Sequence, residues 1–323
     1  MERIEKVYLA GLGAIGGAVS SRICEFDPGC LKIIADKDRI ARYTKNGISI
    51  NGKTYSFHYV EPDKAYEKAD LLLIAVKQHN LARAIEDVRG FVGSETVILS
   101  LLNGITSEEL LAGEFGAEKL LYSFVVGTDT VKEGTATKFA NLGKIVFGER
   151  TNGGLSPKVA AVKEFFERVH MPYAIPENML REMWWKFMMN VGVNQVSAVL
   201  RAPYGIFCRE GEARELMLSA SREVVEISRK AGIGLTEEDI ERYTAVLDGI
   251  SPLGKTSMLQ DVEAGRKTEV EIFAGTVIAL GKKYGVPTPV NDILYRIIRS
   301  IEEMRSPHTP VHCWPGLRPC REE

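Results

Sequence analysis

The stretch Val7-Tyr8-Leu9-Ala10-Gly11-Leu12-Gly13-Ala14-Ile15-Gly16 decides the fold that this sequence predicts. Its first four residues are an apolar run typical of a buried strand, and helical spacing follows over residues 14–25. A GxGxxG pattern therefore lies where a strand gives way to a helix. Such a turn brings backbone N–H groups at a helix N-terminus close to an anion, as in the binding of a dinucleotide pyrophosphate. A glycine-rich turn without a ligand is the weaker interpretation, because the motif stands in the context that it requires.

Each glycine of this turn has a predicted role. Gly11 permits the tight bend, Gly13 lets the backbone approach the phosphates, and Gly16 lets the helix pack closely on the strand. The predicted cofactor-binding residues of the turn are Gly11, Leu12, Gly13, Ala14, Ile15 and Gly16.

Apolar runs of strand length recur over residues 31–35, 71–76 and 97–102. They do not alternate with polar residues, which is typical of parallel strands that are covered on both faces. Because helical patterns separate them, the sequence predicts an α/β fold with a doubly wound sheet of the Rossmann type. Residues 123–127 and 144–147 are predicted to be antiparallel additions to this sheet.

A change of composition near Met171-Pro172-Tyr173 predicts a second domain, because the pattern beyond it is helical. Helices are expected over residues 179–200, 212–231 and 268–284. The predicted domains are a dinucleotide-binding domain over 1–171, an all-helical substrate domain over 172–305 and an irregular tail over 306–323.

Composition excludes several classes of function. The 323 residues carry a formal net charge of −2, so the chain lacks the excess of positive charge that is typical of nucleic-acid-binding proteins. No run approaches the ~18 apolar residues of a membrane span, and the charged start does not fit a signal peptide. The five cysteines fit neither a disulfide framework nor zinc spacing, so free thiols are expected. We therefore expect a cytosolic protein with no metal site and no nucleic-acid or membrane partner.

Three charged residues follow the second predicted strand. Asp36 closes that strand, where an acid can accept hydrogen bonds from an adenosine ribose. An acid there repels a 2′-phosphate and so favours NADH, whereas Lys37 or Arg39 could hold that phosphate and favour NADPH. The alternative is that all three are solvated loop charges. Both cofactors stay open at this point.

A cation and an amide stand at the ends of two further strands. Lys77 follows the strand over 71–76, and Asn103 follows the strand over 97–102. Ligands bind outside the carboxyl ends of such strands, so these side chains could face a nicotinamide and its substrate. A solvated lysine and a turn built on Asn103-Gly104 are the alternatives.

Polar residues four apart mark one face of the helix expected over 179–200. Lys186, Asn190 and Asn194 share that face among aromatic and aliphatic neighbours. Buried lysine is rare unless paired, so a lysine and two amides on one face suit a carboxylate and a carbonyl oxygen. The alternative is a solvated face with the core on the other side.

Ser257 and Glu269 form a third candidate group. Ser257 could cap or begin a helix, and Glu269 lies about three turns further on. The two would not share one face of a straight helix, so the residues alone favour a capping hydroxyl and a surface acid.

Together these motifs resemble the ketopantoate reductase family, also called 2-dehydropantoate 2-reductase. The likeness extends from Gly11 to about Asn291, and the order and spacing of its separate motifs are more specific than any one of them. It rests on the glycine-rich turn, Val76-Lys77, Asn103-Gly104, Lys186 with Asn190 and Asn194, Ser257-Met258-Leu259-Gln260-Asp261, and Lys267-Thr268-Glu269.

The resemblance implies a role for each matching residue. Lys186 matches the catalytic lysine that protonates the keto oxygen, and Glu269 matches the acid that pairs with it. Asn103 matches a catalytic amide near the nicotinamide ribose, and Lys77 matches a lysine that contacts cofactor and substrate. The residues that match those holding the hydroxyl and carboxylate of the substrate are Asn190, Asn194 and Ser257.

The implied activity is NAD(P)H-dependent reduction of the small keto acid 2-dehydropantoate to pantoate, a step of pantothenate and coenzyme A synthesis. The family commonly has an arginine that holds the 2′-phosphate of NADPH where this chain has Asp36. The alternatives are a related reductase of another small keto or hydroxy acid and a regulator that senses NAD(P)H without turnover. A helical second domain often supports dimerisation, so a homodimer is considered alongside a monomer.

Overall fold

The computed structural model describes residues 3–64 and 67–304, so the predicted tail over 306–323 lies outside the described residues. The chain divides into two compact units. The first unit holds the chain up to Met188 together with Ser228–Leu235, and the second holds Met189–Ile227 and the chain from Thr236 onward. The boundary near Met188 falls inside the long helix α6 (Met179–Leu200). The predicted domain division after residue 171 stays a prediction.

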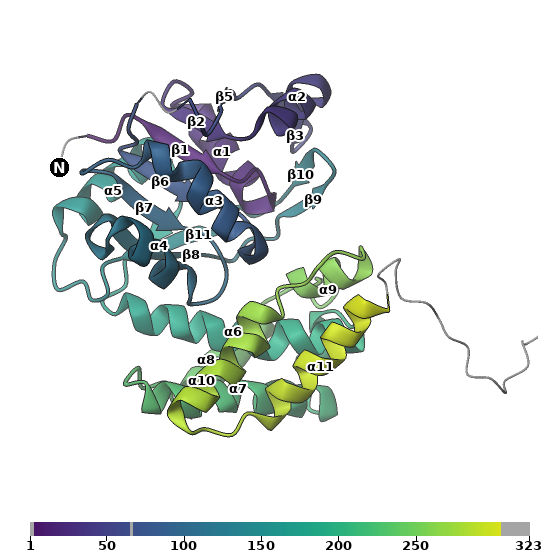
Figure 1. Ribbon diagram of the computed structural model, residues 1–323. Helices are drawn as coiled ribbons and strands as arrows, with labels where there is room; N and C mark the ends of the chain where they lie inside the picture. The colour runs from purple at the N-terminus through teal and green to yellow at the C-terminus, as the bar shows by residue number, and fades with distance from the viewer. Residues whose placement is uncertain (1–2, 65–66, 305–323) are drawn as a thin grey trace, which may run out of the picture. The chain divides into compact units, whose positions relative to one another are not determined.

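The first unit is built on an eight-stranded sheet with the order β12-β11-β8-β7-β6-β1-β2-β5 (Figure 1). In the part of this order that runs β8-β7-β6-β1-β2-β5, each strand is parallel to its neighbours, which confirms the doubly wound sheet. The strands are β1 (Val7–Ala10), β2 (Leu31–Ile34), β5 (His58–Val60), β6 (Leu71–Ile74), β7 (Val97–Ser100), β8 (Leu120–Val126), β11 (Lys144–Gly148) and β12 (Tyr173–Ala174).

The two strands predicted as antiparallel additions pair with each other. β11 is antiparallel to β8, as predicted, and β12 continues the sheet parallel to β11. Residues 123–126 of β8 form the antiparallel pair with β11, whereas Leu120 and Leu121 at the start of the same strand pair with β7 in parallel. α4 (Ser107–Phe115) connects β7 to β8 in the manner of the earlier crossovers, so β8 keeps the direction of its neighbours.

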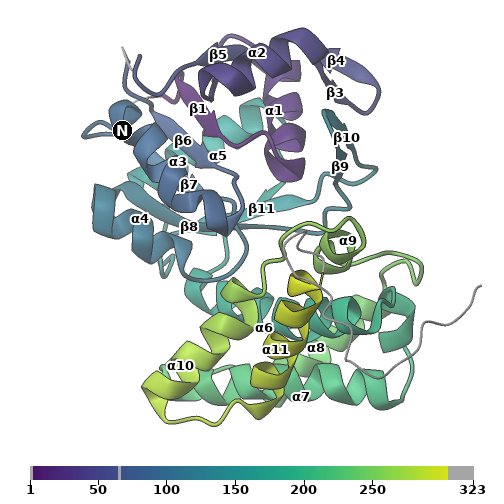
Figure 2. The same ribbon diagram turned by 45° about the vertical axis from the view of Figure 1, so that its right-hand side comes forward.

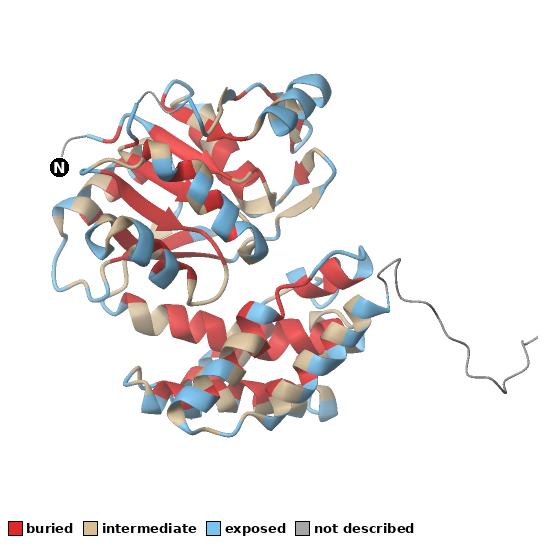
Figure 3. Ribbon diagram, viewed as in Figure 1, coloured by how far each residue is buried: buried red, intermediate tan, exposed pale blue. Residues whose placement is uncertain are grey.

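Helices cover both faces of this sheet. Val7 and Leu9 of β1 pack in one hydrophobic cluster with α1 (Ala14–Phe26) and α5 (Pro157–Arg168). Tyr8 and Ala10 point to the other face and pack in a second cluster with α3 (Leu81–Val88) and α4. Burial on both faces explains why β1, β6 and β7 are apolar except at Ser100, the last residue of β7, and Figure 3 shows these strands as buried. The remaining helical segments of this unit are α2 (Lys37–Asn46), η1 (Gln78–Asn80), η2 (Arg89–Phe91) and η3 (Ala117–Lys119).

A second sheet of the first unit was not predicted. Its order is β4-β3-β10-β9, and Figure 2 shows it beside α1. Gly17 of α1 is close to it, because a Cβ added there would lie 3.1 Å from Thr137 Oγ1 of β10. The strands are β3 (Ile48–Ile50), β4 (Lys53–Tyr55), β9 (Val131–Glu133) and β10 (Ala136–Lys138). Each has three residues and several are polar, so they lack the apolar runs by which the other strands were predicted.

The second unit is helical over its described residues. The predicted helices over 179–200 and 212–231 correspond to α6 and α7 (Glu212–Lys230). The predicted helix over 268–284 begins as a π-helical turn, η5 (Glu271–Gly275), and continues as α10 (Thr276–Tyr284). The other segments are η4 (Tyr204–Phe207), α8 (Glu237–Asp248), α9 (Ser257–Glu263) and α11 (Pro289–Glu303).

A buried amide pair joins the helices of the second unit. Gln195 of α6 donates to Asn291 Oδ1 of α11 over 3.0 Å, and its Oε1 accepts from Ala274 N of η5 over 3.1 Å. Asn291 in turn donates to Glu223 Oε2 of α7 over 2.7 Å. Because buried polar groups are costly unless satisfied, this network fixes η5 relative to α6 and α11.

Three predictions from the sequence concern membrane spans, metal sites and the state of the cysteines. None of the helices over residues 3–64 and 67–304 combines the length and apolar character that crossing a membrane requires. Over the same ranges, no cluster of three or more His, Cys, Asp or Glu side chains could hold a metal ion. Cys24, Cys30 and Cys208 are free thiols, whereas Cys313 and Cys320 lie outside the described residues.

Candidate functional site

The glycine-rich turn joins β1 to α1 as predicted. Gly11 has a φ of +103°, and a Cβ there would lie 2.6 Å from Ala75 O. A Cβ on Gly16 would lie 1.8 Å from Gly11 O, whereas one on Gly13 would meet nothing closer than Ala75 O at 3.6 Å. The packing of the protein therefore requires glycine at Gly11 and Gly16, but not at Gly13. The space in front of Gly13 fits a ligand that approaches the backbone.

The N-terminus of α1 is suited to an anion. Gly13 is its N-cap residue and provides no side-chain cap, and the first turn Ala14-Ile15-Gly16-Gly17 is uncharged. The first N–H groups of a helix lack intrahelical acceptors and carry partial positive charge. The residues present therefore fit a dinucleotide phosphate at this turn.

Alanine substitutions at Gly16 and Gly13 should separate packing from binding. Gly16→Ala is expected to cost about 3 kcal/mol of unfolding free energy and to abolish dinucleotide binding, because its Cβ overlaps Gly11 O. Gly13→Ala is expected to cost less than about 1 kcal/mol while weakening the binding of ADP-ribose. Urea unfolding and calorimetric titration measure the two effects. Equal unfolding midpoints for both variants would contradict this account of Gly16.

The charged residues after β2 form exposed contacts. Asp36 is the N-cap residue of α2, where its Oδ1 accepts from Arg39 N over 2.8 Å. Arg39 Nε lies 3.5 Å from Asp36 Oδ2, and Lys37 Nζ lies 3.7 Å from Glu61 Oε2. Asp36 thus offsets the charge of Arg39. Arg39 and Lys37 are the two cations that were considered as partners of the 2′-phosphate of NADPH.

Lys77 and Asn103 follow neighbouring parallel strands. β1 pairs with both β2 and β6, so the order of the strands reverses beside the glycine-rich turn. Lys77 follows β6, and Asn103 follows β7, the next strand. The turn after β1, Lys77 and Asn103 therefore lie at the same edge of the sheet, where such folds bind their ligands.

The structure brings together two of the predicted catalytic residues. Lys186 of α6 donates from Nζ to Asn103 Oδ1 over 3.1 Å. Its ammonium also lies 5.2 Å from the centre of the Phe124 ring, within the range of a cation–π contact. Only 8% of Lys186 is exposed, which is rare for lysine. These contacts hold the Lys186 ammonium at the sheet edge that carries Asn103.

Glu108 is a buried acid of this site that the sequence did not reveal. It lies in the first turn of α4, where Ser107 Oγ donates to Glu108 Oε2 over 2.9 Å. Ser107 Oγ also lies 2.8 Å from Ser100 Oγ at the end of β7. Burial raises the pKa of Glu108 to about 7, although hydrogen bonds and the charge of Lys186 favour the ionised form. In the sequence nothing distinguishes Glu108 from its exposed neighbour Glu109.

Asn190, Asn194 and Ser257 belong to the second unit. Asn190 and Asn194 follow Lys186 along one face of α6, and they are 8% and 4% exposed, which contradicts the alternative of a solvated face. Ser257 begins α9, but the capping hydroxyl is that of Thr256, which accepts from Leu259 N over 3.1 Å. Thr256 also donates to Ser197 Oγ of α6 over 3.1 Å. The start of α9 is thereby held against α6.

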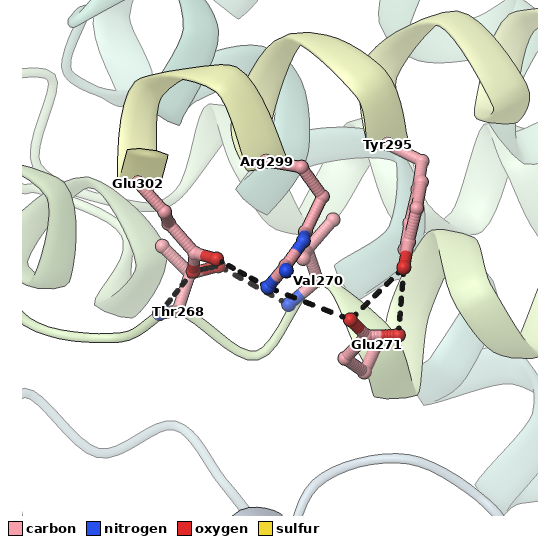
Figure 4. Close-up of polar contacts among 6 residues, drawn as sticks. All are labelled: Thr268, Val270, Glu271, Tyr295, Arg299 and Glu302. Carbon is pink, nitrogen blue, oxygen red and sulfur yellow. Dashed lines mark hydrogen bonds and ion pairs between the residues drawn. The ribbon is translucent and has the colours of Figure 1, made fainter. Parts of the chain in front are cut away.

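Glu269 is also buried, so its interpretation as a surface acid was wrong. The residues on both sides of it contact α11, as Figure 4 shows. Thr268 donates to Glu302 Oε1 from its backbone N and from Oγ1, over 2.7 Å each. Glu271 accepts from Tyr295 OH over 2.9 Å. The segment that carries Glu269 is thus fixed just before the π-helical turn, a feature that is frequent at functional sites.

The doubly wound sheet and its glycine-rich turn define a Rossmann-type NAD(P)-binding domain, and the family match of the chain assigns it to the NAD(P)-dependent oxidoreductases. Residues 7–152 match the family model described as ketopantoate reductase PanE/ApbA, and residues 178–302 match the model of its C-terminal domain. The chain therefore belongs to the ketopantoate reductase family, and the resemblance found in the sequence is confirmed.

One relative in sequence and two solved structures are similar to this protein over almost the whole chain. The 2-dehydropantoate 2-reductase of Streptococcus pyogenes serotype M6 is 24% identical over 302 residues, which cover 92% of this chain and 97% of the relative. D-mandelate dehydrogenase, solved with NADH and anilino(oxo)acetate, is 22% identical with a TM-score of 0.83 over 93% of this chain and 99% of that one. A dimeric ketopantoate reductase from Staphylococcus aureus is 18% identical with a TM-score of 0.76 over 93% and 99% of the two chains. The two structural likenesses show a shared fold.

Proposed function

We propose that this protein reduces 2-dehydropantoate to pantoate with NADPH or NADH, as a step of pantothenate and coenzyme A synthesis. The observation that carries the proposal is the buried Lys186 ammonium, which donates to Asn103 at the ligand-binding edge of the sheet. The family and the name of the Streptococcus pyogenes relative support the choice of substrate.

Lys186 is the proposed general acid. The cofactor supplies the hydride, and the protein positions the ketone and protonates its oxygen. Lysine has an ordinary pKa of about 10.4, so it carries its proton at neutral pH. A donor must come within ~2.6–3.2 Å of the oxygen on which negative charge develops. Asn103, which lies in the same unit as Lys186, accepts a hydrogen bond from the ammonium and holds it in place.

The remaining site residues keep the roles that the family resemblance implies. We propose that Glu269 orients Lys186 and that Lys77 contacts cofactor and substrate. The proposed partners of the hydroxyl and carboxylate of the substrate are Asn190, Asn194 and Ser257. Location in the cytosol and assembly as a homodimer stay predictions, the second supported by the dimeric relative from Staphylococcus aureus.

A reductase of another 2-keto acid is the second candidate. The observation that favours it is the likeness in fold to D-mandelate dehydrogenase. The fold is shared among enzymes whose substrates differ, so the pocket residues decide between the two.

The decisive experiment follows oxidation of NADPH and NADH at 340 nm with 2-dehydropantoate and, in parallel, with benzoylformate. Preferential turnover of 2-dehydropantoate supports the proposal, and preferential turnover of benzoylformate supports the second candidate. Tight cofactor binding without turnover of any keto acid would indicate an NAD(P)H-sensing regulator. The better cofactor shows whether Asp36 or the Lys37 and Arg39 pair governs the ribose site.

Substitution of Glu302 tests whether catalysis depends on the contacts that fix the segment carrying Glu269. Glu302→Ala removes the acceptor of two Thr268 donors, so kcat is expected to fall about tenfold through misplacement of Glu269. Glu302→Gln keeps an acceptor oxygen and is expected to restore most of kcat. Steady-state kinetics of both variants, beside the neighbouring Glu303→Ala as control, measure the effect. An unchanged kcat in Glu302→Ala would remove Glu302 from this role.

A further inference from the structure

A lysine of the second sheet contacts the glycine-rich turn. Lys132 of β9 donates from Nζ to Leu12 O, a residue that lies 120 positions earlier in the sequence. The contact is set up by the packing of β10, the partner strand of β9, against α1 at Gly17 and Thr137. The second sheet therefore delivers a cation to the turn that is suited to a dinucleotide phosphate.

The surroundings of Lys132 do not neutralise its charge. Burial lowers the pKa of Lys132, and the positive charge of Arg42 lowers it further. Among the described residues its hydrogen-bond partner is the carbonyl of Leu12, and the charge that acts on it is that of Arg42 rather than that of a carboxylate. A half-buried cation without a counter-charge costs free energy, so its position is best explained by an anion that binds beside it.

The hydrogen bond to Leu12 leaves Lys132 able to bind such an anion. An ammonium has three N–H donors, and Leu12 O is its acceptor among the described residues. The carbonyl that it contacts stands between Gly11 and Gly13, beside the N–H groups at the start of α1. A neutral donor would be sufficient to fix the carbonyl, whereas a lysine also adds positive charge where phosphates would lie.

We propose that Lys132 is a further cofactor-binding residue, which donates to the pyrophosphate of the dinucleotide while it holds the glycine-rich turn through Leu12. This inference rests on the proposed use of a nicotinamide dinucleotide. The pyrophosphate is common to NADH, NADPH and ADP-ribose, so Lys132 strengthens the binding of all three alike. It is thus distinct from Asp36, Lys37 and Arg39, which concern the ribose and its 2′-phosphate.

Two substitutions separate the charge of Lys132 from its hydrogen bond. Lys132→Gln keeps a neutral donor for Leu12 O and removes the charge, whereas Lys132→Arg keeps both. Lys138→Met removes an exposed lysine from β10 and serves as the matched control. Unfolding midpoints of all variants verify that the first unit remains folded.

Calorimetric titration with NADH, NADPH and ADP-ribose at several salt concentrations tests the proposal. Lys132→Gln is expected to weaken all three roughly 10- to 100-fold and to reduce the salt dependence of Kd, because a charge-assisted hydrogen bond is lost. Lys132→Arg and Lys138→Met are expected to bind as the wild type does.

Three results would overturn the proposal. Binding of Lys132→Gln at the wild-type level would make Lys132 a neutral support of the turn. A loss confined to NADPH would assign it to the 2′-phosphate. In both cases the wild type still reduces its keto acid, so the proposed function stands. Failure of the wild type to bind any dinucleotide would instead refute the proposed function, and this inference with it.

Discussion

Replacing Lys186 with methionine is expected to lower kcat for 2-dehydropantoate reduction by about 10²- to 10⁴-fold, with the Kd for the cofactor unchanged. The alkoxide that forms on hydride addition would then lack its proton donor. Methionine retains an apolar chain beside Phe124 and removes the ammonium that donates to Asn103. Lys186→Ala is expected to lose activity to the same degree, with an added cavity.

The loss should not arise from unfolding. Removing a buried ammonium also removes its desolvation cost, and the acceptor left behind on Asn103 costs about 1–3 kcal/mol. Steady-state rates at 340 nm, cofactor titration and urea unfolding of the same preparations measure the three quantities. Lys163→Met, at an exposed ion pair of α5, is the control and should keep the wild-type kcat. Retention of kcat in Lys186→Met would show that another group protonates the ketone.

The parts of the fold that the sequence predicts are those whose local pattern agrees with their tertiary environment. β1, β6 and β7 are buried on both faces and are therefore apolar except at Ser100, which makes them recognisable without any contact information. The helix over 179–200 was predicted with its observed bounds, since its length and spacing are those of a buried helix.

The features that could not be predicted depend on partners remote in sequence. β3 and β10 form a parallel pair although more than 80 residues separate them, and each has only three residues. Glu269 resembles a surface acid until the contacts of Thr268 and Glu271 with α11 are known. Lys132 likewise can be recognised as a residue of the glycine-rich turn only once its contact with Leu12 is known.

Glu108 illustrates the same limit for a single side chain. Two consecutive acids, Glu108 and Glu109, lie in the first turn of α4, and the helix dipole explains both equally well from the sequence. The fold buries one and exposes the other, because α4 packs on the sheet through the face that carries Glu108 and Leu111. Helical periodicity identifies such a face only when apolar residues mark it.

Glu108→Gln is expected to abolish a pH-dependent loss of stability of the first unit. The folded-state pKa of Glu108 is raised from 4.5 to about 7, so its contribution to stability is fully present below pH 4.5 and is lost as the pH rises through 7. A shift of this size corresponds to about 3 kcal/mol of unfolding free energy. Glutamine cannot ionise, so the variant should lack this component between pH 4.5 and 8.

Urea unfolding of wild type, Glu108→Gln and Glu109→Gln over this pH range measures the difference. Glu109 is exposed on the same helix, so its variant should follow the wild type. Parallel curves for wild type and Glu108→Gln would show that Glu108 does not titrate in this window. In Lys186→Met the loss should occur at higher pH than in the wild type, because the Lys186 ammonium favours the ionised carboxylate. Such a shift of the transition to higher pH would show that Glu108 and Lys186 interact electrostatically. Because this interaction is mutual, the ionisation of Glu108 would also affect the ammonium of the proposed general acid.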